Sequence, residues 1–185
     1  MYRYISSSKS YKRVSNVIDK LNGSRYYFYD ANGNRRTSSG WKKVNGSTAY
    51  YVCDGGYVTS RYTDQKGTKK VYDFDYSKNT WVQKKNMWKT VYRSRYYFGS
   101  KGVATMSYNN STKKAYKFTG RKWKPAKKLI MKIGNANYYF NSAAKRVVKA
   151  GKYKTADGYI AYVNRRGVVY KSCLLYTSPS PETDS

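Results

Sequence analysis

The stretch SRYYFYDANGNRRTSSGWKKVNGSTAYYVCDGG, residues 24–56, contains nearly the same pattern twice. In each half a pair of tyrosines precedes an apolar residue, Phe28 or Val52, and a polar turn that contains glycine follows. Aromatic residues suit a half-buried pleated strand, and glycine adopts the positive φ that tight hairpin turns require. The pattern therefore predicts two aromatic β-hairpins.

The same pattern recurs along the rest of the chain. Tyrosine pairs followed by an apolar residue occur at residues 26–28, 50–52, 96–98 and 138–140, with a weaker copy at 161–163. Four of the five following turns contain glycine, and we assign the positive φ to Gly33, Gly55, Gly102 and Gly167. Two inserted segments, residues 69–85 and 113–128, each read as an alternating strand, a polar turn and a Trp-bearing return strand.

These repeats predict an all-β fold, a linear β-hairpin repeat array of about five to seven hairpins. Residues 11–21 have a weak helical spacing, and a strand is equally consistent there. Residues 74–81 resemble part of a kelch blade, but only two such segments exist and a propeller has about 4–8 blades. We expect an N-terminal segment at a fragment edge (1–16), the hairpin array (17–172) and a non-repeat tail (173–185) that we interpret as non-native.

Positive charge dominates the composition. The chain carries 38 Lys and Arg against 9 Asp and Glu, a net charge of +29 without any His. Such a field attracts polyanions, which include nucleic acid, anionic cell-wall polymer and acidic lipid. The expected polyanion-binding residues lie in lysine pairs that recur around the repeats: Lys42, Lys43, Lys84, Lys85, Lys113 and Lys114.

The sequence lacks the residue sets of catalytic and metal sites. There is no His to activate Cys53 or Cys173, and the only Glu is Glu182 in the expected tail. No metal-ligand spacing is present. We therefore expect no enzyme activity, no cofactor and no metal. No segment approaches the roughly 20 apolar residues of a membrane span. The N-terminus also lacks the apolar run of a secretion signal, so the chain is intracellular or a piece of a longer secreted protein.

Two segments resemble the cell-wall-binding repeat family. GWKKVNGSTAYYVCDGGYVTS (residues 40–60) and MWKTVYRSRYYFGSKGVATMS (residues 87–107) are similar to repeats of Gram-positive bacteria that include choline-binding, glucan-binding and toxin repeats. The resemblance implies a β-solenoid of hairpins that docks a secreted protein onto the bacterial envelope. It thus implies an extracellular, cell-wall-associated location.

In choline-binding members of that family, an aromatic cage uses the Trp after Gly, the aromatic residue before the Tyr pair, and a Tyr of the next repeat. Trp41 and Trp88 match the first of these positions. The second position holds Arg25, Ala49, Arg95 and Asn137 in the four clear copies, so we do not expect a choline cage. We expect stacking on sugar rings instead. The predicted ligand-binding residues are Trp41, Tyr50, Tyr51, Trp88, Tyr96, Tyr97, Tyr138 and Tyr139.

The resulting hypothesis is a non-catalytic module that binds cell-wall glycan or teichoic acid and anchors a larger secreted protein. Adjacent strand residues face opposite sides, so one Tyr of each pair is expected to pack between hairpins. Trp81 and Trp123 are expected in the core. Two alternatives remain at this point: an adhesin or toxin-type repeat that binds host glycans, and single-stranded nucleic-acid binding by stacking and phosphate contact.

Overall fold

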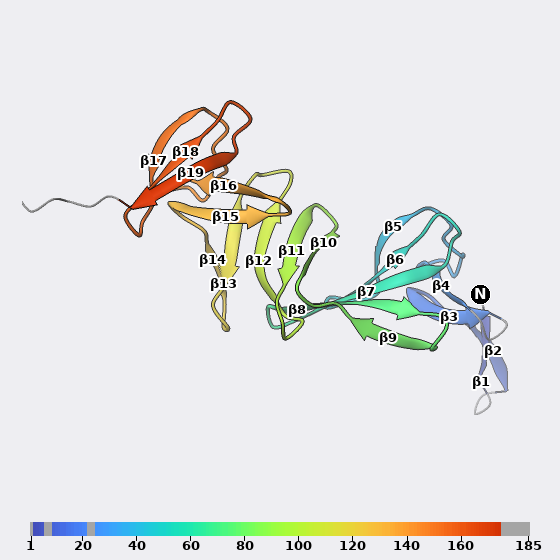
Figure 1. Cartoon of the computed structure of the whole chain (residues 1–185). Coiled ribbons are helices and arrows are strands. Elements are labelled where there is room, and N and C mark those ends of the chain that lie inside the picture. The colour runs from blue at the N-terminus through green and yellow to red at the C-terminus, as the bar shows by residue number, and fades with distance from the viewer. Residues whose placement is uncertain (1, 6–8, 22–24, 175–185) are drawn as a thin grey trace, which may run out of the picture. The chain divides into compact units, whose positions relative to one another are not determined.

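A computed structural model describes residues 2–5, 9–21 and 25–174. These residues form nineteen strands and no helix, and successive strands pair as antiparallel hairpins (Figure 1). The predicted all-β hairpin fold is confirmed. Accordingly, the described residues hold no helix long and apolar enough to cross a bilayer.

The strands are β1 (Tyr2–Ile5), β2 (Ser10–Arg13), β3 (Val17–Leu21), β4 (Arg25–Tyr29), β5 (Gly40–Lys43), β6 (Thr48–Val52), β7 (Val58–Gln65), β8 (Thr68–Asp75), β9 (Thr80–Gln83), β10 (Met87–Val91), β11 (Ser94–Phe98), β12 (Ala104–Asn109), β13 (Ala115–Phe118), β14 (Trp123–Pro125), β15 (Leu129–Ile133), β16 (Ala136–Phe140), β17 (Gly151–Lys154), β18 (Tyr159–Val163) and β19 (Val169–Leu174).

The chain forms two compact units. Unit 1 comprises residues 1–107 and 118–123, and unit 2 comprises residues 108–117 and 124–185. Two five-stranded sheets have the orders β5-β6-β7-β8-β9 and β10-β11-β12-β13-β14, and β17, β18 and β19 form a third sheet. The predicted inserted segments are the hairpins β8–β9 and β13–β14, and they continue the sheets that the Tyr-pair hairpins begin.

Aromatic and β-branched side chains fill three small clusters in unit 1. The first contains Phe28, Val52 and Val58, the second Ala49, Tyr62 and Val91, and the third Val71, Phe98 and Ala104. Trp81 packs against the first cluster and Trp123 against the third, as expected from the sequence. Each cluster joins strands of different hairpins, so burial between hairpins holds unit 1 together.

Unit 2 has a separate cluster of Tyr139, Ala161, Val163 and Val169. The half-buried Tyr153 packs against it, with its ring 5.2 Å from that of Tyr139 in a stacked arrangement. Here, too, rings from neighbouring hairpins share one small core.

The turn after each Tyr-pair strand has one repeated geometry. In the second copy the Gly56 N–H donates to the Cys53 carbonyl at 2.8 Å, and Gly56 has a φ of 75°. Gly33, Gly102 and Gly167 hold the same place with φ of 71°, 68° and 71°. The prediction of Gly55 was wrong by one residue, because the fourth residue of the turn, not the third, takes the left-handed conformation.

The strands expected after the first and fourth turns are missing. Single bridges, Tyr29 to Arg35 and Phe140 to Arg146, stand in their place. Residues 11–21 form parts of β2 and β3, which settles the helix-or-strand alternative in favour of strands. Cys173, which was predicted to lie in the tail, belongs to β19 and pairs with Ile160 of β18. The turn expected at residues 22–24 and the tail residues 175–185 lie outside the described residues.

Candidate functional site

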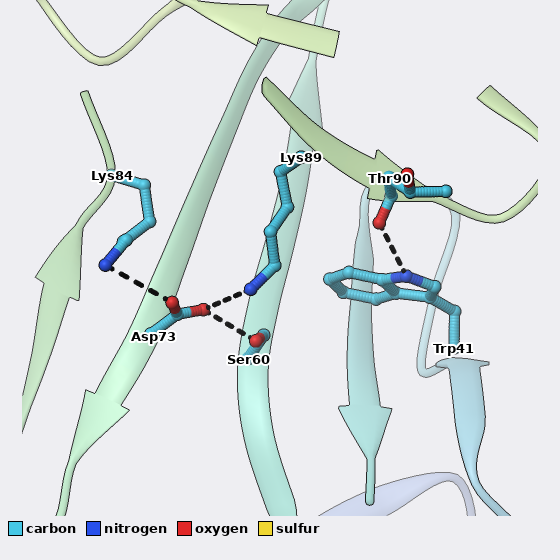
Figure 2. A network of polar contacts seen from close by, with 6 residues as sticks. All are labelled: Trp41, Ser60, Asp73, Lys84, Lys89 and Thr90. Atoms are coloured by element: carbon cyan, nitrogen blue, oxygen red, sulfur yellow. Dashed lines mark hydrogen bonds and ion pairs between the residues drawn. The ribbon is translucent and has the colours of Figure 1, made fainter. Parts of the chain in front are cut away.

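Trp41 of β5 is the centre of the candidate site. It pairs across the strand with Tyr51, and the two rings lie 5.5 Å apart. Its indole N–H donates to the Thr90 carbonyl of β10 at 3.1 Å, as Figure 2 shows. The hydrogen bond fixes the ring between two hairpins and occupies its polar edge, so the ring face is the part available to a ligand.

A first hollow of about 820 Å³ lies beside this ring. Its aromatic lining comes from Phe28, Trp41, Tyr62 and Tyr92, and the Tyr62 and Tyr92 rings lie 6.2 and 6.3 Å from that of Trp41. Tyr92 is 51% exposed, in the two-residue turn between β10 and β11. The hollow combines these rings with many polar and charged side chains, and its size suits a small ligand.

The first hollow has an excess of positive charge. Arg36, Lys42 and Lys43 line it together with Asp30 and Asp64. Asp30 pairs with Arg36 at 2.9 Å, and Asp64 pairs with Lys69. Within the described part of the chain, Lys42 and Lys43 have no ion pair with an acidic residue. Their two charges therefore remain to attract an anion.

Asp30 of the first hollow is held by neighbouring residues. The pKa of Asp30 is lowered, first by the backbone N–H of Asn34, which donates to the carboxylate at 2.9 Å, and also by the Asn32 N–H and Arg36. Because Asp30 stays ionised in this turn, it keeps Arg36 at the rim of the hollow.

Tyr62 stands where the sequence pattern lacks an aromatic residue. Ala49 occupies the position before the Tyr pair, and Tyr62 of β7 is its direct cross-strand partner. Tyr62 is 8% exposed and stacks on Tyr96 with the rings 6.0 Å apart. Burial raises the pKa of Tyr62 above its usual value, with further contributions from Tyr96 and Asp64, so the phenol stays neutral. Tyr62 is thus a buried, neutral ring that packs beside Trp41.

A polar network joins β8 to the β10 hairpin near the same ring. Asp73 accepts a hydrogen bond from the Ser60 hydroxyl at 2.6 Å and pairs with the ammonium groups of Lys89 at 2.9 Å and Lys84 at 3.4 Å (Figure 2). Burial alone raises the pKa of Asp73, but Ser60, Lys89 and Lys84 outweigh it and bring the pKa below its usual value. The carboxylate therefore stays charged and fixes both lysines.

The predicted ligand-binding residues fall into several groups. Trp41 and Tyr51 lie together, and Lys42 and Lys43 line the adjoining first hollow. Tyr50 faces Trp81 at 5.9 Å, and Tyr96 packs between Tyr62 and Trp123. Trp88 lies 5.6 Å from Tyr97 and lines neither hollow described here.

The other predicted site residues have neighbours of their own. In unit 2 the Arg146 guanidinium lies 4.0 Å from the Tyr138 ring centre. Tyr139 is 4% exposed, and its hydroxyl donates to the Lys154 carbonyl at 2.8 Å. Lys84 is paired with Asp73, whereas Lys85, Lys113 and Lys114 are exposed.

Four residues at the site were not predicted from the sequence: Tyr62, Tyr92, Lys89 and Asp73. The β6–β7 register would have revealed Tyr62, because it places this ring opposite Ala49. Lys89 occupies the same hairpin position as Lys42, since both follow a Trp and pair with the first Tyr of a pair. Among the residues that the structure describes, no three His, Cys, Asp or Glu side chains are grouped as metal ligands would be.

No family model and no curated protein matches the chain. Several solved structures are similar to it. Alternansucrase in complex with isomaltononaose is 17% identical, with a TM-score of 0.31 and coverage of 91% of this chain and 15% of that one. Choline-binding protein F from Streptococcus pneumoniae is 18% identical, with a TM-score of 0.22 and coverage of 91% and 68%.

The choline-binding domain of CbpL from Streptococcus pneumoniae is 21% identical, with a TM-score of 0.21 and coverage of 85% of this chain and 98% of that domain. The chain spans less than half of the modular autolysin LytC, 46% of its length. At these TM-scores and identities, the similarities do not establish a shared ligand.

Proposed function

We propose that this chain is a non-catalytic module that binds anionic cell-wall glycan and anchors a larger secreted protein to a Gram-positive envelope. The observation that carries the proposal is the first hollow, where Trp41 and Tyr92 lie beside Lys42 and Lys43, two lysines that pair with no acidic residue among those that the structure describes. Ring faces stack on the C–H faces of sugars, and lysine ammonium groups attract phosphate or carboxylate groups of the polymer.

The overall charge supports the same ligand class. A net charge of +29 on 185 residues favours a dense polyanion, and a bacterial wall rich in teichoic acid is one. Several weak hairpin sites on one chain raise the avidity for a repetitive polymer without any single strong contact. The location that follows from this proposal is extracellular and wall-associated.

The test is retention of the chain on purified walls, with and without teichoic acid, over a range of salt concentrations. Retention should fall steeply with salt and after removal of the acidic polymer, because exposed charges are screened. Retention that persists at high salt on stripped walls points to neutral glucan. Preference for host glycans points to an adhesin or toxin-type repeat, and equal binding to single-stranded DNA contradicts the wall proposal.

Trp41→Ala and Trp88→Ala form a matched pair for this test. Both residues occupy the same position of the repeat, but only Trp41 lines the hollows described above. Loss of a central Trp anchor costs at least about 1 kcal/mol, so Trp41→Ala should weaken retention about fivefold or more. Trp88→Ala should have a smaller effect. Equal retention of parent and Trp41→Ala would make Trp41 a packing residue only.

A further inference from the structure

A second hollow of about 630 Å³ shares Trp41 and Tyr92 with the first one. Its chemistry differs, because it combines rings and hydroxyl groups with a single charged side chain. The lining residues that carry the argument are Trp41, Tyr51, Thr59, Ser60, Lys89 and Thr90. Lys89 is the only charged residue among those that line this hollow.

Lys89 is fixed before any ligand arrives. Its ammonium group lies 2.9 Å from Asp73, and its side chain is 28% exposed. The same Asp73 oxygen accepts the Ser60 hydroxyl, while Lys84 approaches the other oxygen. Asp73 itself does not line the hollow. It positions Lys89, and a side chain that is already ordered loses less entropy when a ligand binds.

The charges of this network do not cancel. Lys84 and Lys89 carry two positive charges and Asp73 carries one negative charge, which leaves one positive charge beside the hollow. An ammonium group has three donors, so Lys89 retains hydrogen-bonding capacity beyond its bond to Asp73. A ligand with one anionic group would balance the network, whereas a cationic ligand would meet repulsion.

We propose that the second hollow binds a sugar residue with one anionic substituent, a carboxylate or a phosphate, placed at Lys89. The Trp41 and Tyr51 rings flank the sugar, and Thr59, Ser60 and Thr90 belong to the same lining. The Ser60 hydroxyl donates to Asp73, so it can only accept a further hydrogen bond. This proposal rests on the proposed function and names the ligand class within it.

The test compares three small sugars in NMR titrations of the full chain: methyl glucuronide, glucose 1-phosphate and neutral methyl glucoside. The indole N–H signal of Trp41 serves as the readout, because that group bonds Thr90 in the lining of the hollow. The parent should prefer an acidic sugar over the neutral one by about tenfold, the size expected for one hydrogen bond to a charged group. The carboxylate and phosphate arms show which anion is preferred.

Lys89→Gln and Lys84→Gln are the matched variants. Both remove an ion-pair partner of Asp73, but only Lys89 lines the hollow. Lys89→Gln should lose the tenfold preference, because it removes the donor that lines the hollow. Lys89→Arg should keep most of the preference. Lys84→Gln should lower it only in part, because it removes a charge of the network but not the donor. Thermal unfolding of each variant checks that unit 1 is folded.

The proposal is overturned if Lys84→Gln and Lys89→Gln lose the preference equally, since that indicates a structural effect through Asp73. It is also overturned if the parent binds none of the sugars or shows no preference. If the parent is retained on walls but gives one of these results, the sugar site is wrong and the proposed function still holds. Absence of wall retention would remove the proposed function instead.

Discussion

Asp73→Asn should lower the free energy of unfolding of unit 1 by about 2 kcal/mol. The amide has the size of the carboxylate and can still accept the Ser60 hydroxyl, so the loss comes mainly from charge. Two partly buried ion pairs, at 2.9 Å to Lys89 and 3.4 Å to Lys84, contribute up to about 1 kcal/mol each. Hydrogen bonds to charged groups exceed neutral ones by about 1 kcal/mol, which applies to the bond from Ser60.

Urea unfolding followed by Trp fluorescence measures this loss in unit 1 alone. The chain has four Trp residues, and Trp41, Trp81, Trp88 and Trp123 all belong to unit 1. The free energy of unfolding comes from linear extrapolation to zero urea. Asp75→Asn is the control, because Asp75 bonds only within its own turn, to Ser77 and Lys78, and its replacement should cost less.

The stability that Asp73→Asn loses should become smaller as the pH falls. The folded-state pKa of Asp73 lies below its usual value, so its charge stabilises unit 1 above the unfolded-state pKa of about 3.9. That stabilisation disappears as the pH falls through the folded-state pKa. The difference between parent and Asp73→Asn should therefore be full near neutral pH and shrink in acid. Equal stability of the two proteins at neutral pH, or a difference that persists unchanged into strong acid, would refute the reasoning.

Two further changes in unit 1 test its packing and turns. Phe98→Ala should lower the free energy of unfolding in the Trp-monitored transition by about 3–5 kcal/mol, because Phe98 is fully buried against Val71 and Ala104. A loss below about 1 kcal/mol would contradict this core. Gly102→Ala should cost at least about 1–2 kcal/mol, since its φ is 68° and a Cβ there would lie 2.3 Å from the Gln83 side-chain nitrogen. Gly99→Ala, in the same turn, should be near neutral, because its Cβ would meet only ordinary contacts from 3.5 Å outward; equal losses for both glycines would exclude the assigned turn.

Local patterns in the sequence predicted most of the hairpins, although the return strands after the first and fourth turns are only single bridges. Tyr pairs, intervening glycines and alternating strands act within a few residues, so β6, β7 and the β8–β9 hairpin were all foreseen. The sequence did not predict that these hairpins continue one another in five-stranded sheets. Sheet order depends on contacts between residues far apart in the chain, and a single pattern does not encode them.

In the candidate site, too, the residues of a local pattern were predicted and those that depend on distant partners were not. Trp41, Lys42 and Lys43 follow one another in a recognisable repeat and were predicted. Tyr62 was missed because its role depends on lying opposite Ala49 in the next strand, and Lys89 because its role depends on Asp73. Trp88 has the same local pattern as Trp41 and an equivalent cross-strand Tyr. Its ring nevertheless lies under Arg95, whereas Tyr62 and Tyr92 lie beside the ring of Trp41. Local similarity therefore does not make the two Trp residues equivalent.

The central claim, that wall glycan binds at Trp41, is tested most directly by fluorine NMR of the chain labelled with 5-fluorotryptophan. The four Trp residues give four signals, which single Trp→Phe variants assign. On titration with soluble wall glycan, the Trp41 signal should shift progressively while the signals of the packed Trp81 and Trp123 stay nearly in place. Binding that leaves the Trp41 signal unmoved, or that moves the Trp88 signal instead, would contradict the account.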